Sequence, residues 1–511
     1  MGRLPRRSFP AASFAAAWLW SGPALAHAFG QRYDLPLPLS LYVGGAGATV
    51  ALSFVVMALF VREGRAGHAL WRLDLAPSRA GRLMAHPWVI AALQAISVAI
   101  FLLVLLAAFF GDANPTRNFA PTFVWVVWWI GLAYLQALVG DIWRVVNPWR
   151  VLFGWAEALL QRTGWQIRPV DYPAWLGHWP AVLFFWIFAW LALVSDAAER
   201  PATLGVLILI YSVLTWGGMA IFGRETWLAR GEAFSVVFGL LARFAPLAGG
   251  GVPAGEIEAD EPEQPAAAGL TLRPYGVGLL AGRPLGTSAV CLVLLMLTSV
   301  TYDGIGETPL WAGFLDWVVV SESLRAPLLA LQKSGVDLLA FLRSLGLLVP
   351  PLAFFATFAL FSRLTALVLA RAGGPDRTGA STCVAAGAFV LTFVPIALAY
   401  HLAHYLSYLL LAGQFVLPLA SDPFGLGWNL FGTANWVLDI GIVSIKTVWW
   451  IAVVAVIVGH LYAVYLAHVM ALRLYGSGRA ALLSQLPLVL LMVGYTMISL
   501  WILSQPIVET G

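Results

Sequence analysis

Charged residues are scarce in this chain: only 11% of its 511 residues are Asp, Glu, Lys or Arg, whereas 60% are hydrophobic. The mean hydropathy of +0.84 is far above what a water-exposed surface tolerates, which excludes a water-soluble fold. Cysteine is rarer still. Cys291 and Cys383 are the only two, and they build neither a disulfide framework nor a CxxC redox or zinc motif.

Signatures of soluble enzymes are missing as well. The chain has no Walker loop, no GxSxG nucleophile elbow, no HExxH zinc motif and no protein-kinase motif set, so nothing indicates nucleotide use. The pI of about 9.1 looks basic, but the net charge is only +4 and the arginines concentrate in particular loops. This distribution is typical of membrane topology and not of nucleic-acid binding.

What the sequence has in abundance is long, continuous apolar runs. A membrane-crossing helix needs about 20 mainly apolar residues, and continuous runs favour helices over the alternating pattern of a β-barrel. We therefore expect an all-α polytopic membrane protein with about ten transmembrane helices. The predicted spans are residues 39–61, 87–110, 123–140, 180–196, 203–223, 286–302, 346–370, 384–412, 446–470 and 481–504.

The first residues have the form of a cleavable signal peptide, residues 1–26. Three arginines precede an apolar stretch, which ends in the small residues before Ala26. Cleavage at this point would make His27 the first residue of the mature chain. The alternative is an uncleaved membrane anchor.

Arginine positions predict the orientation in the membrane. The loops at 62–86, 141–179, 224–285, 371–383 and 471–480 contain 18 of the 29 Lys and Arg residues. By the positive-inside rule these loops are cytoplasmic, so both mature termini are periplasmic, in agreement with an exported N-terminus. The expected location is the bacterial inner membrane.

A Gly- and Pro-rich acidic stretch at 248–272 is predicted to be a flexible cytoplasmic linker. It divides the chain into two membrane halves, residues 27–247 and 273–511, with about five spans each. Just before it, residues 230–245 combine apolar residues at helical spacing with charged ends. This pattern predicts an interfacial helix on the inner membrane surface.

Ionisable side chains within membrane spans are costly, which makes them the first candidates for function. His401 and His404 share one helical face, and the next span contains His460 at a similar predicted depth, beside Gly459, which would permit close helix approach. Three imidazoles suit a divalent metal ion such as zinc or copper. The alternatives are interhelical hydrogen bonds alone, a proton relay, and a haem b held by His404 and His460.

Three further residues are candidates outside the middle of the membrane. A mature N-terminal His27 would chelate one copper ion through its amine and imidazole. Asp303 and Asp422 belong to predicted periplasmic segments and are candidate catalytic residues, as ligands or general bases at the outer mouth of a histidine cavity. The alternative for both carboxylates is ordinary turn formation.

Five parts of the chain carry a family resemblance. They are HAFGQRYDLPLPL (27–39), NFAPTFVWVVWWIGL (118–132), DIWRVVNPWRVL (141–152), SDPFGLGWNLFGTA (421–434) and the paired AYHLAHYLS and GHLYAVYLAH. Together they resemble a family of bacterial polytopic membrane proteins commonly labelled fenitrothion hydrolase. That label implies hydrolysis of organophosphate phosphotriesters, chemistry that generally relies on one or two metal ions.

The sequence therefore supports hypotheses of different classes. The first is a metal-dependent hydrolase of hydrophobic organophosphate esters. The second is a membrane transporter or metal-handling protein, for copper or coupled to protons. The third is a haem-binding or scaffold subunit. The expected partners are the lipid bilayer and a partner membrane protein, without nucleic acid or nucleotide.

Overall fold

The computed structural model describes residues 35–60, 71–249, 270–280, 284–371, 382–475 and 479–505. The predicted signal peptide, His27 and most of the predicted linker lie outside these ranges. Within them the chain is mainly helical, and the only strands are three of two residues each.

Ten helical segments in the described ranges are long and apolar enough to cross a membrane. This confirms the predicted all-α polytopic architecture. The segments are α2 (Leu39–Phe60), α5 (Pro87–Phe110), α6 to α7 (Phe119–Leu138), η4 to α10 (Ala174–Leu193), α11 (Pro201–Phe222), α14 (Thr287–Gly306), α17 (Leu338–Arg371), α18 to α20 (Thr382–Ser421), α21 (Ile445–Tyr475) and α22 (Arg479–Ser504).

Two of these segments are composite in a way that matters for the site. The third contains a π-helix, η3 (Phe123–Gly131), between α6 (Phe119–Thr122) and α7 (Leu132–Leu138). The eighth contains α18 (Thr382–Phe389), a 3₁₀ turn and then α19 (Val394–Ala412). Such π segments are rare and occur frequently at functional sites.

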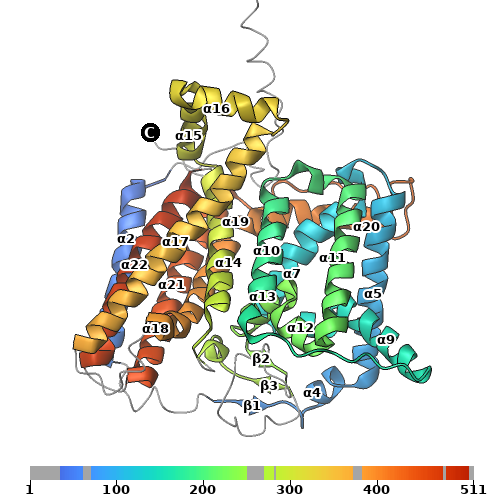
Figure 1. The fold of residues 1–511 in the computed structure, drawn as a ribbon, viewed down its shortest axis with the longest axis horizontal. Coiled ribbons are helices and arrows are strands. Elements are labelled where there is room, and N and C mark those ends of the chain that lie inside the picture. Colours follow the sequence, from blue (N-terminus) through green and yellow to red (C-terminus); the bar gives the residue numbers. More distant parts are fainter. Residues whose placement is uncertain are drawn as a thin grey trace, which may run out of the picture.

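The helices form two groups with α14 and α19 between them (Figure 1). In the most apolar 18-residue stretch of α14, 78% of the residues are buried inside the protein. The corresponding buried share is 72% in the α18 to α20 segment and only 17% in α5. The two predicted membrane halves contact each other, since α2, from the first half, packs against α21 and α22 of the second. Side chains on α14 and α19 therefore face protein and not lipid.

Shorter helices complete the first group. They are α4 (Arg79–Met84), α8 (Trp143–Val146), α9 (Pro148–Arg162), α12 (Arg224–Arg230) and α13 (Ala233–Ala242). The structure differs here from the predicted interfacial helix at 230–245, since nine of the ten residues of α13 are buried. Both faces of α13 are apolar, so this helix is stabilised by packing against protein on all sides, and its position at the inner membrane surface stays a prediction.

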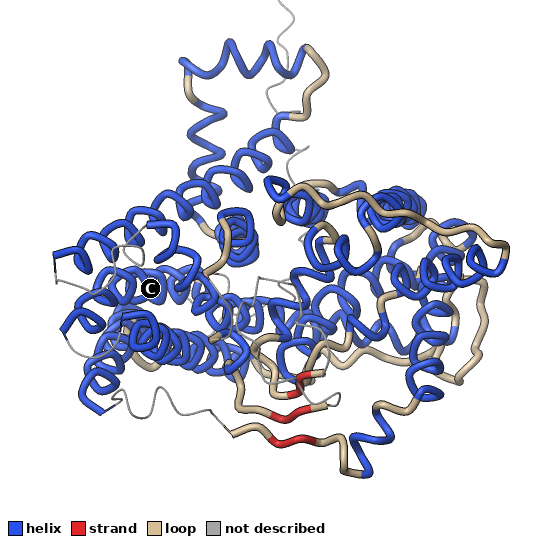
Figure 2. Tube along the Cα trace, turned by 60° about the horizontal axis from the view of Figure 1, so that its bottom comes forward, coloured by secondary structure: helices blue, strands red, loops and turns tan. Residues whose placement is uncertain are grey.

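Three short strands gather at one end of the molecule, which we call the strand end (Figure 2). They are β1 (Leu73–Asp74), β2 (Leu247–Ala248) and β3 (Thr271–Leu272), antiparallel in the order β1-β3-β2. Leu272 pairs with both Leu73 and Leu247. The sheet thereby joins a loop of the first half to the segments that flank the predicted linker.

A helical hairpin of α15 (Pro309–Val320) and α16 (Glu322–Lys333) projects at the opposite end, which we call the hairpin end (Figure 1). The predicted spans leave residues 303–345 as a connecting loop, because neither helix of the hairpin is long enough to span a bilayer. Thr308 caps α15 by accepting a hydrogen bond from the Trp311 backbone N–H, and Pro309 occupies the first turn.

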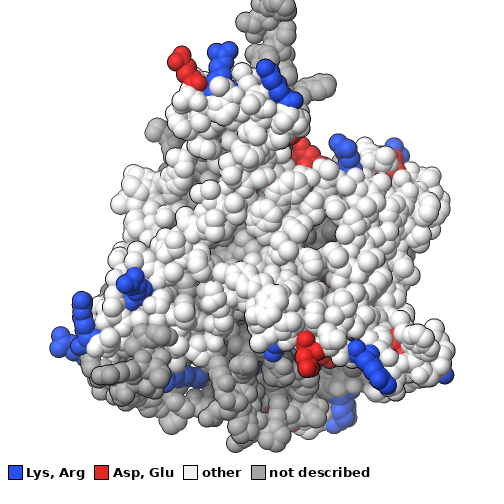
Figure 3. Space-filling view, in the orientation of Figure 1, with Lys and Arg blue, Asp and Glu red and all other residues white. Residues whose placement is uncertain are grey.

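Charged side chains separate the two ends from the middle of the molecule. Figure 3 shows Lys, Arg, Asp and Glu gathered at the strand end and the hairpin end, with a broad uncharged belt between them on this face. Such a belt is what a bilayer's hydrocarbon layer requires of a protein surface.

Candidate functional site

Two central helices, α14 and α19, bring an aspartate, a histidine and a tyrosine into contact. Asp303 lies in the last turn of α14, and His404 and Tyr405 are neighbours on α19. Asp303 Oδ2 accepts hydrogen bonds from the Tyr405 hydroxyl at 2.6 Å and from His404 Nε2 at 2.9 Å. The side chain of His404 is 4% exposed and that of Asp303 is 22% exposed. Because charge is costly at such a place, this pair is the leading functional candidate.

Asp303 was expected in a loop, but it is helical. The predicted span ends at residue 302, whereas α14 continues to Gly306. A Cβ added at Gly304 would lie 2.8 Å from the hydroxyl of Tyr400 and 3.8 Å from the ring of His404. The glycine therefore lets α19 side chains approach the backbone of α14 beside Asp303.

His401 lies one turn before His404 and is surrounded by aromatic rings. Its ring packs edge-on against Tyr134 and Tyr405, at centroid distances of 5.2 and 4.8 Å, and Trp129 of the π-helix lies 6.1 Å away. Neither ring nitrogen has a hydrogen-bond partner among the residues that the structure describes, although the side chain is buried. Burying an unpaired polar group costs about 1–3 kcal/mol, so such groups in a native fold call for an explanation.

His460 contacts a different set of groups. Its Nδ1 donates to the Val456 carbonyl at 2.8 Å, while Nε2 has no partner in the described part of the chain. Its ring lies 6.1 Å from that of Tyr495 on α22. The Tyr495 hydroxyl is 2.5 Å from Thr301 Oγ1, and Tyr495 is the donor because Thr301 donates its proton to the Leu297 carbonyl. These contacts connect α21 and α22 to α14, one half-turn from Asp303.

Tyr400 lies between the two groups of polar side chains. Its ring stacks parallel to that of His404 at a centroid distance of 6.3 Å, and its hydroxyl lies beside Gly304 of α14. The hydroxyl is buried and has no hydrogen-bond partner among the described residues.

The close contact of α19 and α21 depends on Gly459. A Cβ at this position would lie 2.4 Å from the Cβ of Ala399 and 2.8 Å from the carbonyl oxygen of Pro395. The sequence-based expectation that Gly459 permits close helix approach beside His460 is confirmed.

The structure does not gather the deep histidines around one point. His401 and His404 both contact Tyr405, whereas His460 packs against α22. In the ranges that the structure covers, no group of three or more His, Cys, Asp or Glu side chains is placed to hold a metal ion. Because His27 lies outside these ranges, ligation of zinc or copper by these four histidines, and haem b binding, stay predictions.

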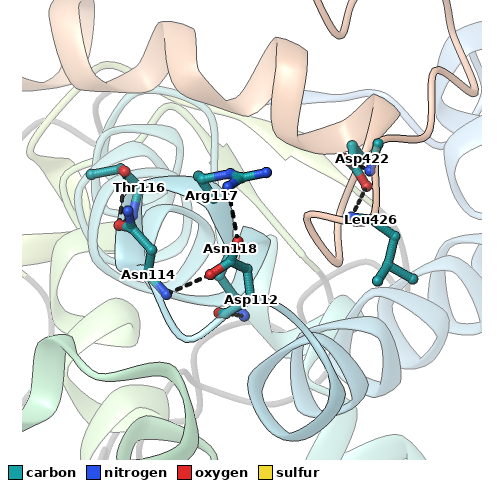
Figure 4. A network of polar contacts seen from close by, with 8 residues as sticks. Asp112, Asn114, Thr116, Arg117, Asn118, Asp422 and Leu426 are labelled. Atoms are coloured by element: carbon teal, nitrogen blue, oxygen red, sulfur yellow. Dashed lines mark hydrogen bonds and ion pairs between the residues drawn. The ribbon is translucent and has the colours of Figure 1, made fainter.

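Asp422, the other candidate carboxylate, lies in a turn and bonds to backbone groups. Its two oxygens accept hydrogen bonds from the backbone N–H groups of Leu426 at 2.9 Å and Gly427 at 2.7 Å. Figure 4 shows the Asp422–Leu426 contact together with Asp112 and Asn118 of the loop between α5 and α6. The turn packs on that loop, where the Asp112 N–H donates to the Phe424 carbonyl at 2.8 Å. Asp422 therefore stabilises its own turn, which contacts the neighbouring loop through Phe424, and its role in catalysis stays a prediction.

Polar groups continue toward both ends of the molecule. Toward the strand end, Nδ1 of the fully buried His468 donates to the side-chain oxygen of Gln485 at 3.0 Å. Toward the hairpin end, Glu307 follows the last turn of α14. Partial burial, together with the nearby negative charge of Asp303, raises the pKa of the Glu307 carboxyl above its usual range.

Sequence reasoning missed a second buried carboxylate, Glu232. It is fully buried at the start of α13 and accepts hydrogen bonds from the backbone N–H groups of Phe234 at 3.0 Å and Ser235 at 2.7 Å, and from the Tyr211 hydroxyl. Burial raises the pKa of Glu232, and these hydrogen bonds oppose the shift in part. An acidic residue just before an apolar run is a helix-start signal that could have indicated this cap.

Comparison of the chain with protein-family models, with curated proteins and with solved structures gave no match. The resemblance to the fenitrothion hydrolase family therefore stays a prediction.

Proposed function

We propose that this chain is a proton-coupled membrane transporter whose proton-binding group is the Asp303–His404 pair. The hydrogen bond between the two titratable side chains, on adjacent central helices, carries the proposal. When the pair binds one proton, its net charge changes from −1 to 0, and in a low-dielectric bundle this change strongly alters the interaction with its surroundings. Buried Asp and His side chains in membrane proteins commonly serve as proton relays.

The groups around the pair support a proton path inward from the hairpin end. Glu307 lies at the outer end of α14, one turn beyond Asp303. Beyond the pair, Tyr400, Tyr495 and Thr301 supply hydroxyl groups, and His460 supplies an imidazole nitrogen without a partner in the described chain. Hydroxyl and imidazole groups can accept one proton while releasing another, which is the property that a relay needs.

We place the protein in the bacterial inner membrane with both mature ends in the periplasm. The arginine-rich loops and the predicted export signal support this orientation. In that orientation the hairpin end is periplasmic, and protons reach the Asp303–His404 pair from the periplasmic side.

Proton flux into proteoliposomes tests the proposal. With a pH-sensitive dye inside and a potassium diffusion potential as the driving force, we expect the wild type to take up protons. Asp303→Asn should lower the rate at least about tenfold, since the amide cannot exchange a proton, a loss worth about 1.4 kcal/mol or more. Asp337→Asn is the matched control, because the Asp337 carboxylate accepts hydrogen bonds from the backbone N–H groups of Leu339 and Ala340 and lies outside the site, and it should keep the wild-type rate. Wild-type flux through a folded Asp303→Asn variant would contradict the proposal.

Hydrolysis of hydrophobic organophosphate esters is the second candidate function. The same Asp303–His404 contact favours it, because a carboxylate orients a histidine that acts as a general base or as a metal ligand. If it operates, purified protein loaded with zinc or copper should release nitrophenol from such esters, and chelation or His404→Ala should abolish the release. Proton flux without ester hydrolysis would favour transport, and the reverse result would favour the enzyme.

A further inference from the structure

An apolar groove runs through the first group of helices, apart from the Asp303–His404 pair. It has a volume of about 500 Å³ and lies between α5, the π-helix η3, α10 (Trp179–Leu193) and α11. Its wall includes Ile100, Trp128, Phe188, Leu204 and Ile208. This volume is in the range of small-molecule binding pockets, which is about 300–1,000 Å³.

The groove opens on the part of the surface that faces the bilayer. Its rim includes Ile96 and Leu135, which are 56% and 48% exposed, and Ile210 and Leu214, which are 52% and 48% exposed. All four lie within apolar membrane-spanning segments. The opening is therefore continuous with the hydrocarbon layer and not with water.

Most polar groups on the groove wall are already paired within the protein. The Trp149 indole N–H donates to Ser212 Oγ at 2.7 Å, and the Ser97 hydroxyl donates to the Val146 carbonyl. The Tyr211 hydroxyl donates to Glu232, behind the wall. With these groups occupied, the wall presents almost only hydrocarbon and aromatic surface, which selects an apolar occupant over a polar one.

We propose that this groove binds one hydrocarbon chain of a membrane lipid, which enters sideways from the bilayer. Apolar lining, volume and lateral opening together carry the inference, and it does not depend on proton transport.

The bound chain would lie against the same π-helix that contacts His401. Trp128 lines the groove, and its neighbour Trp129 lies 6.1 Å from the His401 ring. A lipid in the groove therefore packs against a helical segment that also shapes the aromatic surroundings of the histidine.

Native mass spectrometry tests the site, with the full-length protein in detergent micelles that contain palmitoyl-oleoyl phosphatidylethanolamine. We expect the wild type to retain one lipid at collision energies that remove all loosely bound lipid. Ile208→Trp places an indole ring in the middle of the groove and should lower the retained fraction about tenfold. Val213→Trp is the matched control, because Val213 is on the same helix, is 67% exposed and does not line the groove. This variant should retain the lipid.

Equal retention in the wild type and a folded Ile208→Trp variant would overturn the proposal. Retention of the intact dimer instead of lipid, lost in the same variant, would also overturn it in favour of a second copy. If Ile208→Trp fails to fold, Leu207→Phe is a smaller change on the same wall, and it should also reduce retention relative to Val213→Trp. Because the readout is lipid mass, failure here leaves the proton-flux result unaffected.

Discussion

Single buried residues carry most of the chemistry in this protein. Asp303, His404 and Glu232 are the clearest. Asp303 and Glu232 accept hydrogen bonds from hydroxyl, imidazole or backbone N–H donors, and His404 donates to Asp303. The two carboxylates differ in role. Glu232 caps a helix and accepts hydrogen bonds from its backbone, whereas Asp303 accepts hydrogen bonds from side chains of another helix, which can exchange a proton with it.

The pH dependence of stability should report on Glu232. Burial raises the pKa of this carboxyl in the folded protein above its ordinary value of 4.5, so the folded state binds the proton more tightly than the unfolded state. The stabilisation is full below pH 4.5 and is lost as the pH rises through the folded pKa, by up to about 1.4 kcal/mol per pH unit. We expect the melting temperature of Glu232→Gln to fall less steeply above pH 4.5 than that of the wild type.

Thermal unfolding followed by tryptophan fluorescence from pH 4 to pH 8 checks this difference. Glu225→Gln serves as the control, because Glu225 is half-exposed and paired with Arg150 at 2.8 Å, and it should keep the wild-type slope. If the melting temperatures of the wild type and Glu232→Gln change in parallel with pH, folding does not raise the pKa of the Glu232 carboxyl, which would contradict the prediction.

At the scale of elements, small residues decide where helices can meet. Gly459 brings α21 against α19, and Gly304 admits Tyr400 and His404 to the backbone of α14. In membranes, where lipid is as apolar as the helix surface, close packing and interhelical hydrogen bonds supply much of the association energy. The polar site therefore depends on these two contacts.

A pair of glycine substitutions separates close packing from helix propensity. Gly459→Ala places a Cβ 2.4 Å from Ala399 Cβ, so the helices must move apart, and we expect a loss of about 1–3 kcal/mol in stability. Gly494→Ala on α22 meets nothing within 4 Å and should gain about 0.5–1 kcal/mol from the better helix former. Chemical denaturation in mild detergent measures both, and a stabilising Gly459→Ala would contradict the packing argument.

At the scale of the whole molecule, the secondary-structure elements and the charged side chains are both arranged along one axis. The sheet of β1, β3 and β2 lies at one end and the α15–α16 hairpin at the other, with the uncharged belt between them. The proposed orientation makes the hairpin periplasmic and the strand end cytoplasmic.

Thiol labelling in intact cells tests this orientation. In a Cys291→Ala background, Cys383 is exposed at the start of α18, and Ser334→Cys adds a thiol at the exposed end of the hairpin. A membrane-impermeant maleimide should label residue 334 in intact cells and residue 383 only after the membrane is opened. Labelling in the opposite order would reverse the topology.

The sequence alone determined the ten spans, because each depends on local hydrophobicity over about 20 residues, and the bilayer imposes that requirement directly. It also identified His401, His404 and His460 as unusual, since ionisable groups within apolar runs are visible without any fold. Gly459 was recognised for the same local reason.

Only the tertiary structure decided which of these groups meet. Asp303 and His404 are 101 residues apart, and their hydrogen bond depends on the packing of α14 against α19, which hydropathy does not encode. The end of α14 beyond residue 302, the burial of α13 and the separation of His460 from His404 likewise follow from contacts between distant segments. Helix existence is a local property, whereas helix neighbours and side-chain partners are set by the complementarity of whole surfaces.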